Sequence, residues 1–196
     1  MKTVMAARRP RIYLAGPDVF LPDARRMGAE KARRAAEAGF QGCFPLDQEL
    51  NLAGLPNGEQ ARRISLANEA LMRSCDLLIA NMTPFRGVSM DPGTAFEIGY
   101  MRAHGRPVLG YTNVTPDLKV RAEVWRQRGI PPGDADRTDL EIEDFGLAEN
   151  LMMEIAIMEA GGAVVREAVP AGEEMTALTG FQRCLEQARR IVAAGN

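Results

Sequence analysis

The sequence predicts an α/β fold built on a parallel sheet, and two observations support this prediction. Short apolar segments alternate with longer amphipathic segments along almost the whole chain, which is the pattern of strands joined by crossover helices. The segment 76–80 (DLLIA) is continuously apolar after its first residue, as expected for a strand that helices cover on both faces. The length of 196 residues suits one domain, so we expect residues 1–196 to form a single domain.

The expected strands are short apolar runs that stop at glycine, proline or polar residues. They cover 11–15, 40–44, 76–80, 107–111 and 163–165. The expected helices show apolar positions at a spacing near 3.6 residues and cover 23–38, 59–73, 93–103, 118–128, 147–160 and 180–194. The segment 129–143 is rich in proline and acidic residues without periodicity, so we expect a mobile loop there.

Composition excludes several classes of protein. The chain has 24 Lys and Arg against 26 Asp and Glu, a net charge of -2, which argues against nucleic-acid and membrane-surface partners. It has no apolar run of about 20 residues, and its first ten residues lack the apolar stretch of a signal peptide, so we expect neither a membrane span nor a signal peptide. Three scattered cysteines and one histidine give no zinc site and no disulfide framework, which fits the cytoplasm. Neither glycine-rich phosphate-binding motif occurs, so we expect no cofactor and no metal.

The segment 86–100 (RGVSMDPGTAFEIGY) is the most informative for function. Asp91 precedes a helix whose first residue is Pro92, and Glu97 lies one turn inside. Asp91 alone is explained by the helix dipole. Glu97, however, stands between Phe96 and Ile98, which is a poor setting for a solvated glutamate. The small residues around Gly93 leave room for a ligand.

Four blocks of sequence resemble the nucleoside 2-deoxyribosyltransferase family. They are IYLAGPDVF (12–20), CDLLIANMTPFRG (75–87), DPGTAFEIGY (91–100) and FGLAENLM (145–152). The resemblance implies a flavodoxin-like, doubly wound α/β fold of about five parallel strands with helices on both faces. It also implies a homo-oligomer whose sites are completed by a neighbouring subunit, nucleoside and free nucleobase as substrates, and a role in nucleotide salvage.

The resemblance assigns roles residue by residue. Glu97 matches the nucleophile, Tyr13 the tyrosine that orients it, and Asp91 the aspartate beside the sugar 5'-hydroxyl. Asn150 and Met152 match residues that reach the neighbouring subunit's site. The remaining candidate substrate contacts are Gly16, Phe20, Asp47, Asn68 and Gly93, and Asn68 stands where some members carry a base-contacting aspartate.

These residue types suit cleavage of an N-glycosidic bond. A carboxylate near the anomeric carbon can trap the sugar as a covalent glycosyl-enzyme, and attack by a second base gives net retention. Packing of Tyr13 in the strand, and cap and core roles for Asn150 and Met152, are the structural alternatives. Two further functions stay open, namely hydrolysis of nucleosides or their 5'-monophosphates and a non-enzymatic nucleotide-sensing module.

The first of these alternatives depends on which groups surround the sugar. A carboxylate at position 91 about 4 Å from a phosphate would be repelled by about 4 kcal/mol at an effective dielectric constant of about 20. This favours an uncharged 5'-hydroxyl, hence a nucleoside. Arg86 and Ser89 would reverse that preference if they enclosed a phosphate.

Overall fold

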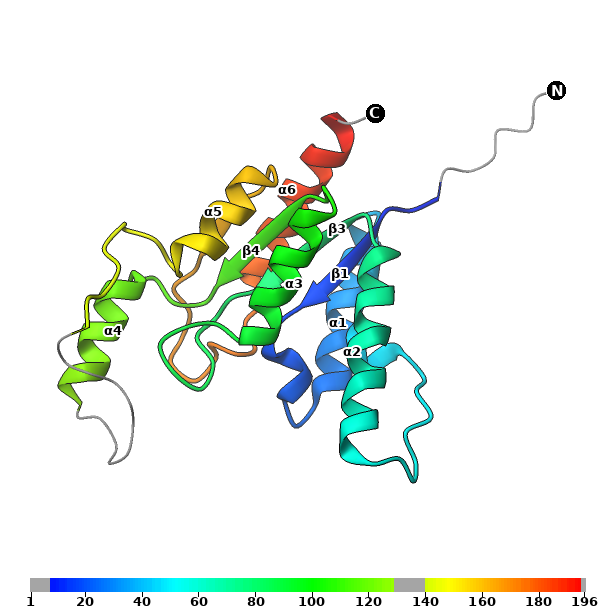
Figure 1. Ribbon diagram of the computed structural model, residues 1–196. Helices are drawn as coiled ribbons and strands as arrows, with labels where there is room; N and C mark the ends of the chain where they lie inside the picture. The colour runs from blue at the N-terminus through cyan, green and yellow to red at the C-terminus, as the bar shows by residue number, and fades with distance from the viewer. Residues whose placement is uncertain (1–7, 129–139, 195–196) are drawn as a thin grey trace.

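A five-stranded parallel sheet forms the centre of the computed structural model, which describes residues 8–128 and 140–194 (Figure 1). The strands are β1 (Arg11–Ala15), β2 (Gln41–Cys43), β3 (Leu77–Asn81), β4 (Val108–Thr112) and β5 (Val164–Arg166). Their order is β2-β1-β3-β4-β5, and each neighbouring pair runs parallel. This order confirms the predicted doubly wound, flavodoxin-like fold.

The six expected helices are all present, together with two short 3-10 helices that the sequence did not predict. They are η1 (Pro17–Phe20), α1 (Ala24–Glu37), η2 (Pro45–Asp47), α2 (Asn57–Arg73), α3 (Pro92–Ala103), α4 (Leu118–Gln127), α5 (Leu151–Glu159) and α6 (Thr179–Ala194). α5 begins four residues later than expected because the side chain of Asn150 accepts a hydrogen bond from the Met152 N–H and caps the helix. Residues 129–139 of the expected mobile loop lie outside the described residues.

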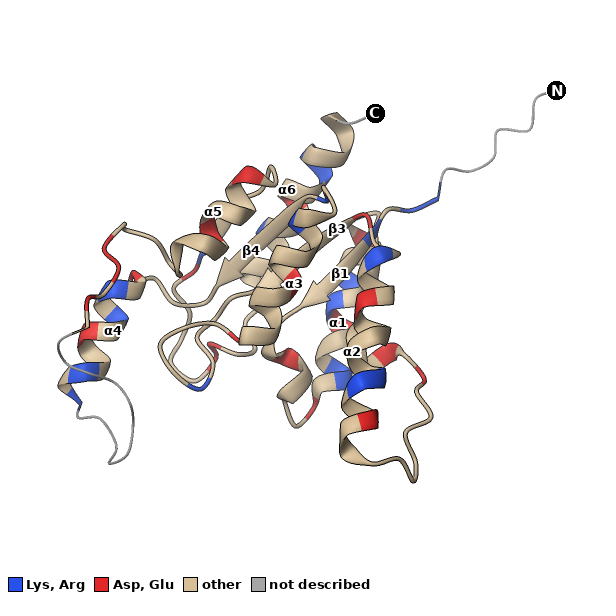
Figure 2. Cartoon of the chain, viewed as in Figure 1, with Lys and Arg blue, Asp and Glu red and all other residues tan. Residues whose placement is uncertain are grey.

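Helices cover both faces of the sheet. Strand residues alternate between the faces, so Ile12 and Leu14 pack with α1 and α6 in one core, whereas Tyr13 and Ala15 pack with α2, α3 and α5 in the other. All five residues of β3 and of β4 are buried, as the apolar strand pattern predicts. Charges of both signs are interspersed over the outer helices (Figure 2). No helix in the described part of the chain is long and apolar enough to span a membrane.

The strand order places the loops after β1 and β3 at the point where the order reverses. In open parallel sheets this point, at the carboxyl ends of the strands, is where ligands bind. Gly16 begins the loop after β1 with a φ of 148°, and a Cβ atom there would come within 2.7 Å of the Asn81 Cβ at the end of β3. Only glycine therefore lets the two loops approach this closely.

Candidate active site

Tyr13 and Glu97 form the central contact of the candidate site. Tyr13 is fully buried on β1, and Glu97 lies in the second turn of α3. The Tyr13 hydroxyl donates a hydrogen bond of 2.5 Å to Glu97 Oε1. Burial and the neighbouring carboxylate raise the pKa of Tyr13, so its hydroxyl stays protonated and remains a donor. The two residues are 84 positions apart in sequence, so the parallel fold brings them together.

The carboxylate of Glu97 sits in an environment that disfavours its charge. Burial raises the pKa of Glu97 to about 7; the hydrogen bond from Tyr13 opposes this rise, and the negative charge of Asp91 adds to it. A carboxyl group with a pKa near neutrality exchanges its proton within the physiological range. Perturbed values of this kind concentrate at functional sites.

Asp91 stands at the N-terminus of the helix that carries Glu97. Its Oδ2 accepts hydrogen bonds from the Thr94 N–H at 2.9 Å and from the Thr94 hydroxyl at 3.1 Å, so it is the N-cap of α3. Gly93 keeps this turn open, since a Cβ there would lie 2.9 Å from Asp91 Oδ2. The capping role predicted from the helix dipole is therefore present, and the second carboxylate oxygen, Oδ1, makes no hydrogen bond to the described residues.

A cleft of about 400 Å³ opens between α2 and α3. Its lining includes Asn68, Gly93, Phe96 and Glu97, so three of the predicted site residues share one cavity. Asn68 Oδ1 accepts a hydrogen bond of 3.0 Å from the Gln48 side chain. Two other concavities are larger: Arg102 and Met152 line one, and Asp47 and Gln48 line the other. The cleft beside α2 is the one that contains the Tyr13-bound carboxylate, and we take it as the candidate active site.

An aromatic cluster follows the two loops at the carboxyl edge of the sheet. Phe20 is 55% exposed and stacks on Phe85 with a centroid separation of 5.2 Å. The Arg86 guanidinium lies 4.5 Å from the Phe85 ring centroid and 5.0 Å from that of Phe20. Arg86 also has a φ of 56°, the only positive value for a non-glycine residue among those described. The stacked pair places one exposed aromatic ring, that of Phe20, at this edge of the sheet.

Five predicted contacts do not line the cleft: Gly16 and Phe20, in the loop after β1, and the three positions that follow. Asp47 faces a separate concavity and connects to the cleft only through its neighbour Gln48. Asn150 caps α5 and donates its amide N–H to Glu143. Met152 is 67% exposed and lines a groove with Gly99. Of the last two positions, only Met152 is exposed; the Asn150 side chain bonds within its own chain.

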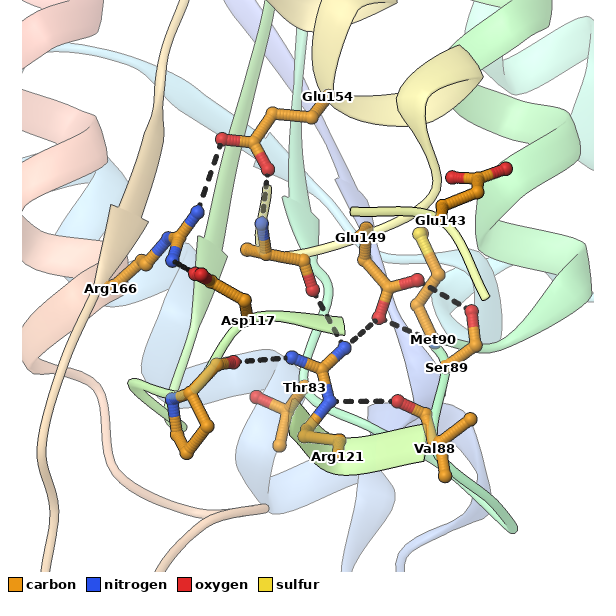
Figure 3. A network of polar contacts seen from close by, with 12 residues as sticks. Thr83, Val88, Ser89, Met90, Asp117, Arg121, Glu143, Glu149, Glu154 and Arg166 are labelled. Carbon is orange, nitrogen blue, oxygen red and sulfur yellow. Dashed lines mark hydrogen bonds and ion pairs between the residues drawn. The ribbon is translucent and has the colours of Figure 1, made fainter. Parts of the chain in front are cut away.

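A buried polar network joins the loop before α3, helix α4 and the start of α5, and it was missed by sequence reasoning (Figure 3). Glu149, 1% exposed, accepts hydrogen bonds from the Ser89 hydroxyl at 2.5 Å and the Met90 N–H at 3.1 Å, and it pairs with Arg121 at 2.7 Å. Because Glu149 and Arg121 are 28 residues apart, no local motif reveals the pair. Within the described ranges no cluster of three or more His, Cys, Asp or Glu could hold a metal ion.

The sheet order defines a flavodoxin-like, doubly wound α/β protein, and comparisons identify its family. Residues 12–152 match the family model of nucleoside 2-deoxyribosyltransferase. The uncharacterized protein C191.05c of Schizosaccharomyces pombe is 34% identical over 170 residues, covering 79% of this chain and 80% of the relative. The chain belongs to the nucleoside 2-deoxyribosyltransferase family.

Solved structures agree with this assignment. A 2-deoxyribosyltransferase from Leishmania mexicana superposes with a TM-score of 0.62 at 27% identity, covering 90% of this chain and 97% of the other. A conserved protein from Enterococcus faecalis V583 superposes with a TM-score of 0.57 at 18% identity, covering 92% and 99% of the two chains. The second likeness shows the fold alone.

Proposed function

We propose that this protein is a nucleoside deoxyribosyltransferase in which Glu97 is the nucleophile. The observation that carries the proposal is the hydrogen bond from Tyr13 to Glu97 inside a cleft that is large enough for part of a nucleoside. A tyrosine that stays protonated at physiological pH orients one carboxylate oxygen and leaves the other free to attack. Family membership and the likeness to the Leishmania mexicana enzyme support the same activity.

The proposed reaction has two displacements at C1' of the sugar. In the first, the ionised Glu97 attacks C1', the bond from C1' to the base breaks, and the base nitrogen takes the electron pair and a proton. In the second, a nitrogen of another base attacks C1', the bond to Glu97 breaks, and that base loses a proton. Two inversions give net retention, as in retaining glycosidases.

Contacts within the site support an uncharged nucleoside over its 5'-monophosphate. The Ser89 hydroxyl donates its hydrogen bond to Glu149, so it is not free to donate to a phosphate. Asp91, by contrast, has an oxygen free to accept a hydrogen bond from a sugar hydroxyl. We assign Asp91 to the 5'-hydroxyl, and Gly16, Phe20, Asn68 and Gly93 to substrate binding.

We also propose a homo-oligomer in which α5 of one subunit completes the cleft of another. Large apolar side chains are exposed on the helices of this face, including Phe96 at 57%, Met152 at 67% and Met158 at 53%. Exposed apolar surface of this kind is typical of an interface. Asn150 and Met152 would then reach the sugar in the neighbouring subunit, with Asp47 near the base. A role in nucleoside salvage in the cytoplasm completes the proposal.

Trapping the covalent intermediate tests the proposal. A 2'-deoxy-2'-fluoro-arabinonucleoside should glycosylate the enzyme, because the fluorine slows the second displacement, and peptide mass spectrometry should place the sugar on Glu97. Glu97→Gln should remain unmodified and lose turnover. A label on any other residue would contradict the assignment. Incubation of deoxyadenosine with and without a second free base separates the reactions: exchange of the base indicates transfer, whereas equal release of adenine without an acceptor indicates hydrolysis.

A further inference from the structure

Glu149 lies between two segments that carry candidate site residues. On one side it accepts hydrogen bonds from Ser89 and from the Met90 N–H, the two residues that lead directly into Asp91. On the other side it is followed in sequence by Asn150, the N-cap of α5. One buried carboxylate therefore fixes both the loop before α3 and the start of α5 (Figure 3).

Arg121 completes this connection from α4. Its guanidinium pairs with Glu149 and donates to the carbonyl groups of Val88 at 2.8 Å, Ala148 at 2.6 Å and Pro116 at 2.7 Å. The side chain thus contacts the loop before Asp91, the segment before Asn150 and the loop after β4. A planar guanidinium can serve several acceptors in fixed directions, which a lysine ammonium cannot do.

We propose that Glu149 and Arg121 are positioning residues that set the place of Asp91 in its own subunit and of Asn150 at the start of α5. The proposal rests on the proposed function, because that function gives Asp91 and Asn150 their roles at the site. The contacts of Glu149 and Arg121 are independent of it. Neither Glu149 nor Arg121 lines the cleft of about 400 Å³, so they act through the segments that they hold.

The salt bridge between Glu149 and Arg121 has the features of a contact that positions the segments around it. Its side chains are 0% and 11% exposed, so breaking it leaves a buried charge without its partner. The carboxylate is satisfied by three donors from two segments. Such a network fixes the relative geometry of the elements that it joins.

The main test compares Glu149→Gln with Glu154→Gln. Glu154 is also a buried glutamate of this network; it accepts the Ala148 N–H at 2.6 Å and lies 3.7 Å from Arg166, and it makes no hydrogen bond to residues 88–91 within the described part of the chain. If Glu149 positions Asp91, Glu149→Gln should raise KM for deoxyadenosine about tenfold with kcat within about threefold, because contacts to a remote hydroxyl add uniform binding. Glu154→Gln keeps the contacts to residues 88–91 and should raise KM by less than Glu149→Gln does.

A purely structural role gives a different result. Loss of folded protein lowers the apparent kcat and leaves KM unchanged, and that outcome for Glu149→Gln would overturn the inference. Arg121→Lys should reproduce the KM increase, because it keeps the charge and loses the three carbonyl contacts. Ser89→Ala, which removes a single donor, should show a smaller increase in KM and covers the case in which Glu149→Gln does not fold.

Amide hydrogen exchange separates this inference from the proposed function. The Thr94 N–H reports on the Asp91 cap through its 2.9 Å hydrogen bond, whatever reaction the protein performs. Glu149→Gln should accelerate exchange at residues 89–94, whereas Glu154→Gln should not. Unchanged exchange there overturns the positioning role. If the two variants show this exchange pattern but the wild-type protein does not transfer deoxyribose, only the proposed function is overturned.

Discussion

The hydrogen bond from Tyr13 stabilises the ionised form of the Glu97 carboxyl group. Burial raises its pKa to about 7, and the hydrogen bond from Tyr13 is the contact that opposes this rise. A nucleophile must be ionised, so activity should fall as the pH drops below about 7, where the carboxyl group takes up its proton. In the proposed mechanism, Tyr13 would therefore control both the orientation of the carboxylate and the pH range in which it reacts.

Replacing Tyr13 with phenylalanine should lower kcat/KM by about 10- to 100-fold, because a hydrogen bond to a charged group contributes about 1.5–3 kcal/mol. The pKa of Glu97 should rise further, which moves the acidic limb of the kcat/KM profile to higher pH. Rates measured from about pH 5 to pH 9 check the shift. Tyr111→Phe is the matched control, because the Tyr111 hydroxyl is buried and has no hydrogen-bond partner among the described residues. An unmoved limb in Tyr13→Phe would contradict the role assigned to Tyr13.

At the level of single residues, the sequence pointed to a candidate site residue where a charged residue stands in an unusual apolar context. Glu97 is conspicuous because a glutamate between Phe96 and Ile98 has no obvious structural reason. Glu149 and Arg121 lack such a pattern, since a buried charge is recognised only by its partner, and the partner comes from another element. The roles of Asn150 and Met152 depend on a second subunit, so neither the sequence pattern nor one chain's geometry decides them.

At the level of elements, strand periodicity and turn residues predicted the sheet and all six helices. They failed where a side chain decides the boundary, as at Asn150, and where a short turn of helix is held by tertiary contacts, as in η1. The Asp18 carboxylate in η1 is 2% exposed and pairs with Lys31 of α1 at 2.7 Å. This ion pair fastens the loop after β1 to α1.

Lys31→Met should destabilise the protein by about 3–5 kcal/mol, because it leaves the Asp18 charge buried without its partner. The double variant Asp18→Asn with Lys31→Met removes the charge and should recover part of that loss. Urea denaturation of the three proteins measures the free energy of unfolding. Arg33→Met, which breaks solvent-exposed pairs with Glu30 and Glu37 on the same helix, should leave the free energy of unfolding almost unchanged. Equal losses for Lys31→Met and Arg33→Met would refute this view of η1.

At the level of the whole molecule, α2 and α5 cover one face of the sheet with α3 between them (Figure 1), and the cleft is lined by residues of α2 and α3. In the proposed oligomer, a single subunit would present half of a site on each side of α3. In a dimer with twofold symmetry, each half can meet the complementary half of the partner. Exposed apolar side chains on α3 and α5 supply surface for that contact.

Mixing two inactive variants tests this arrangement. Glu97→Ala and Asn150→Ala should each have little activity alone, and subunits exchanged between them should regain about a quarter of the wild-type turnover, since half of the dimers are mixed and each has one intact site. A mixture of Glu97→Ala with Tyr13→Ala, both in the same half, should regain none. Absence of recovery after proven subunit exchange would show that each chain builds its site alone.

Helix α3 carries Asp91 at its cap and Glu97 six positions later, and a helix advances about 1.5 Å and turns about 100° per residue. The helix therefore holds the two acidic residues at a fixed separation of about 9 Å along its axis. Inserting or deleting one amino acid within this interval would swing Glu97 away from the sheet, whatever residue was chosen. The length of this interval is therefore set by the relative placement of the two acids.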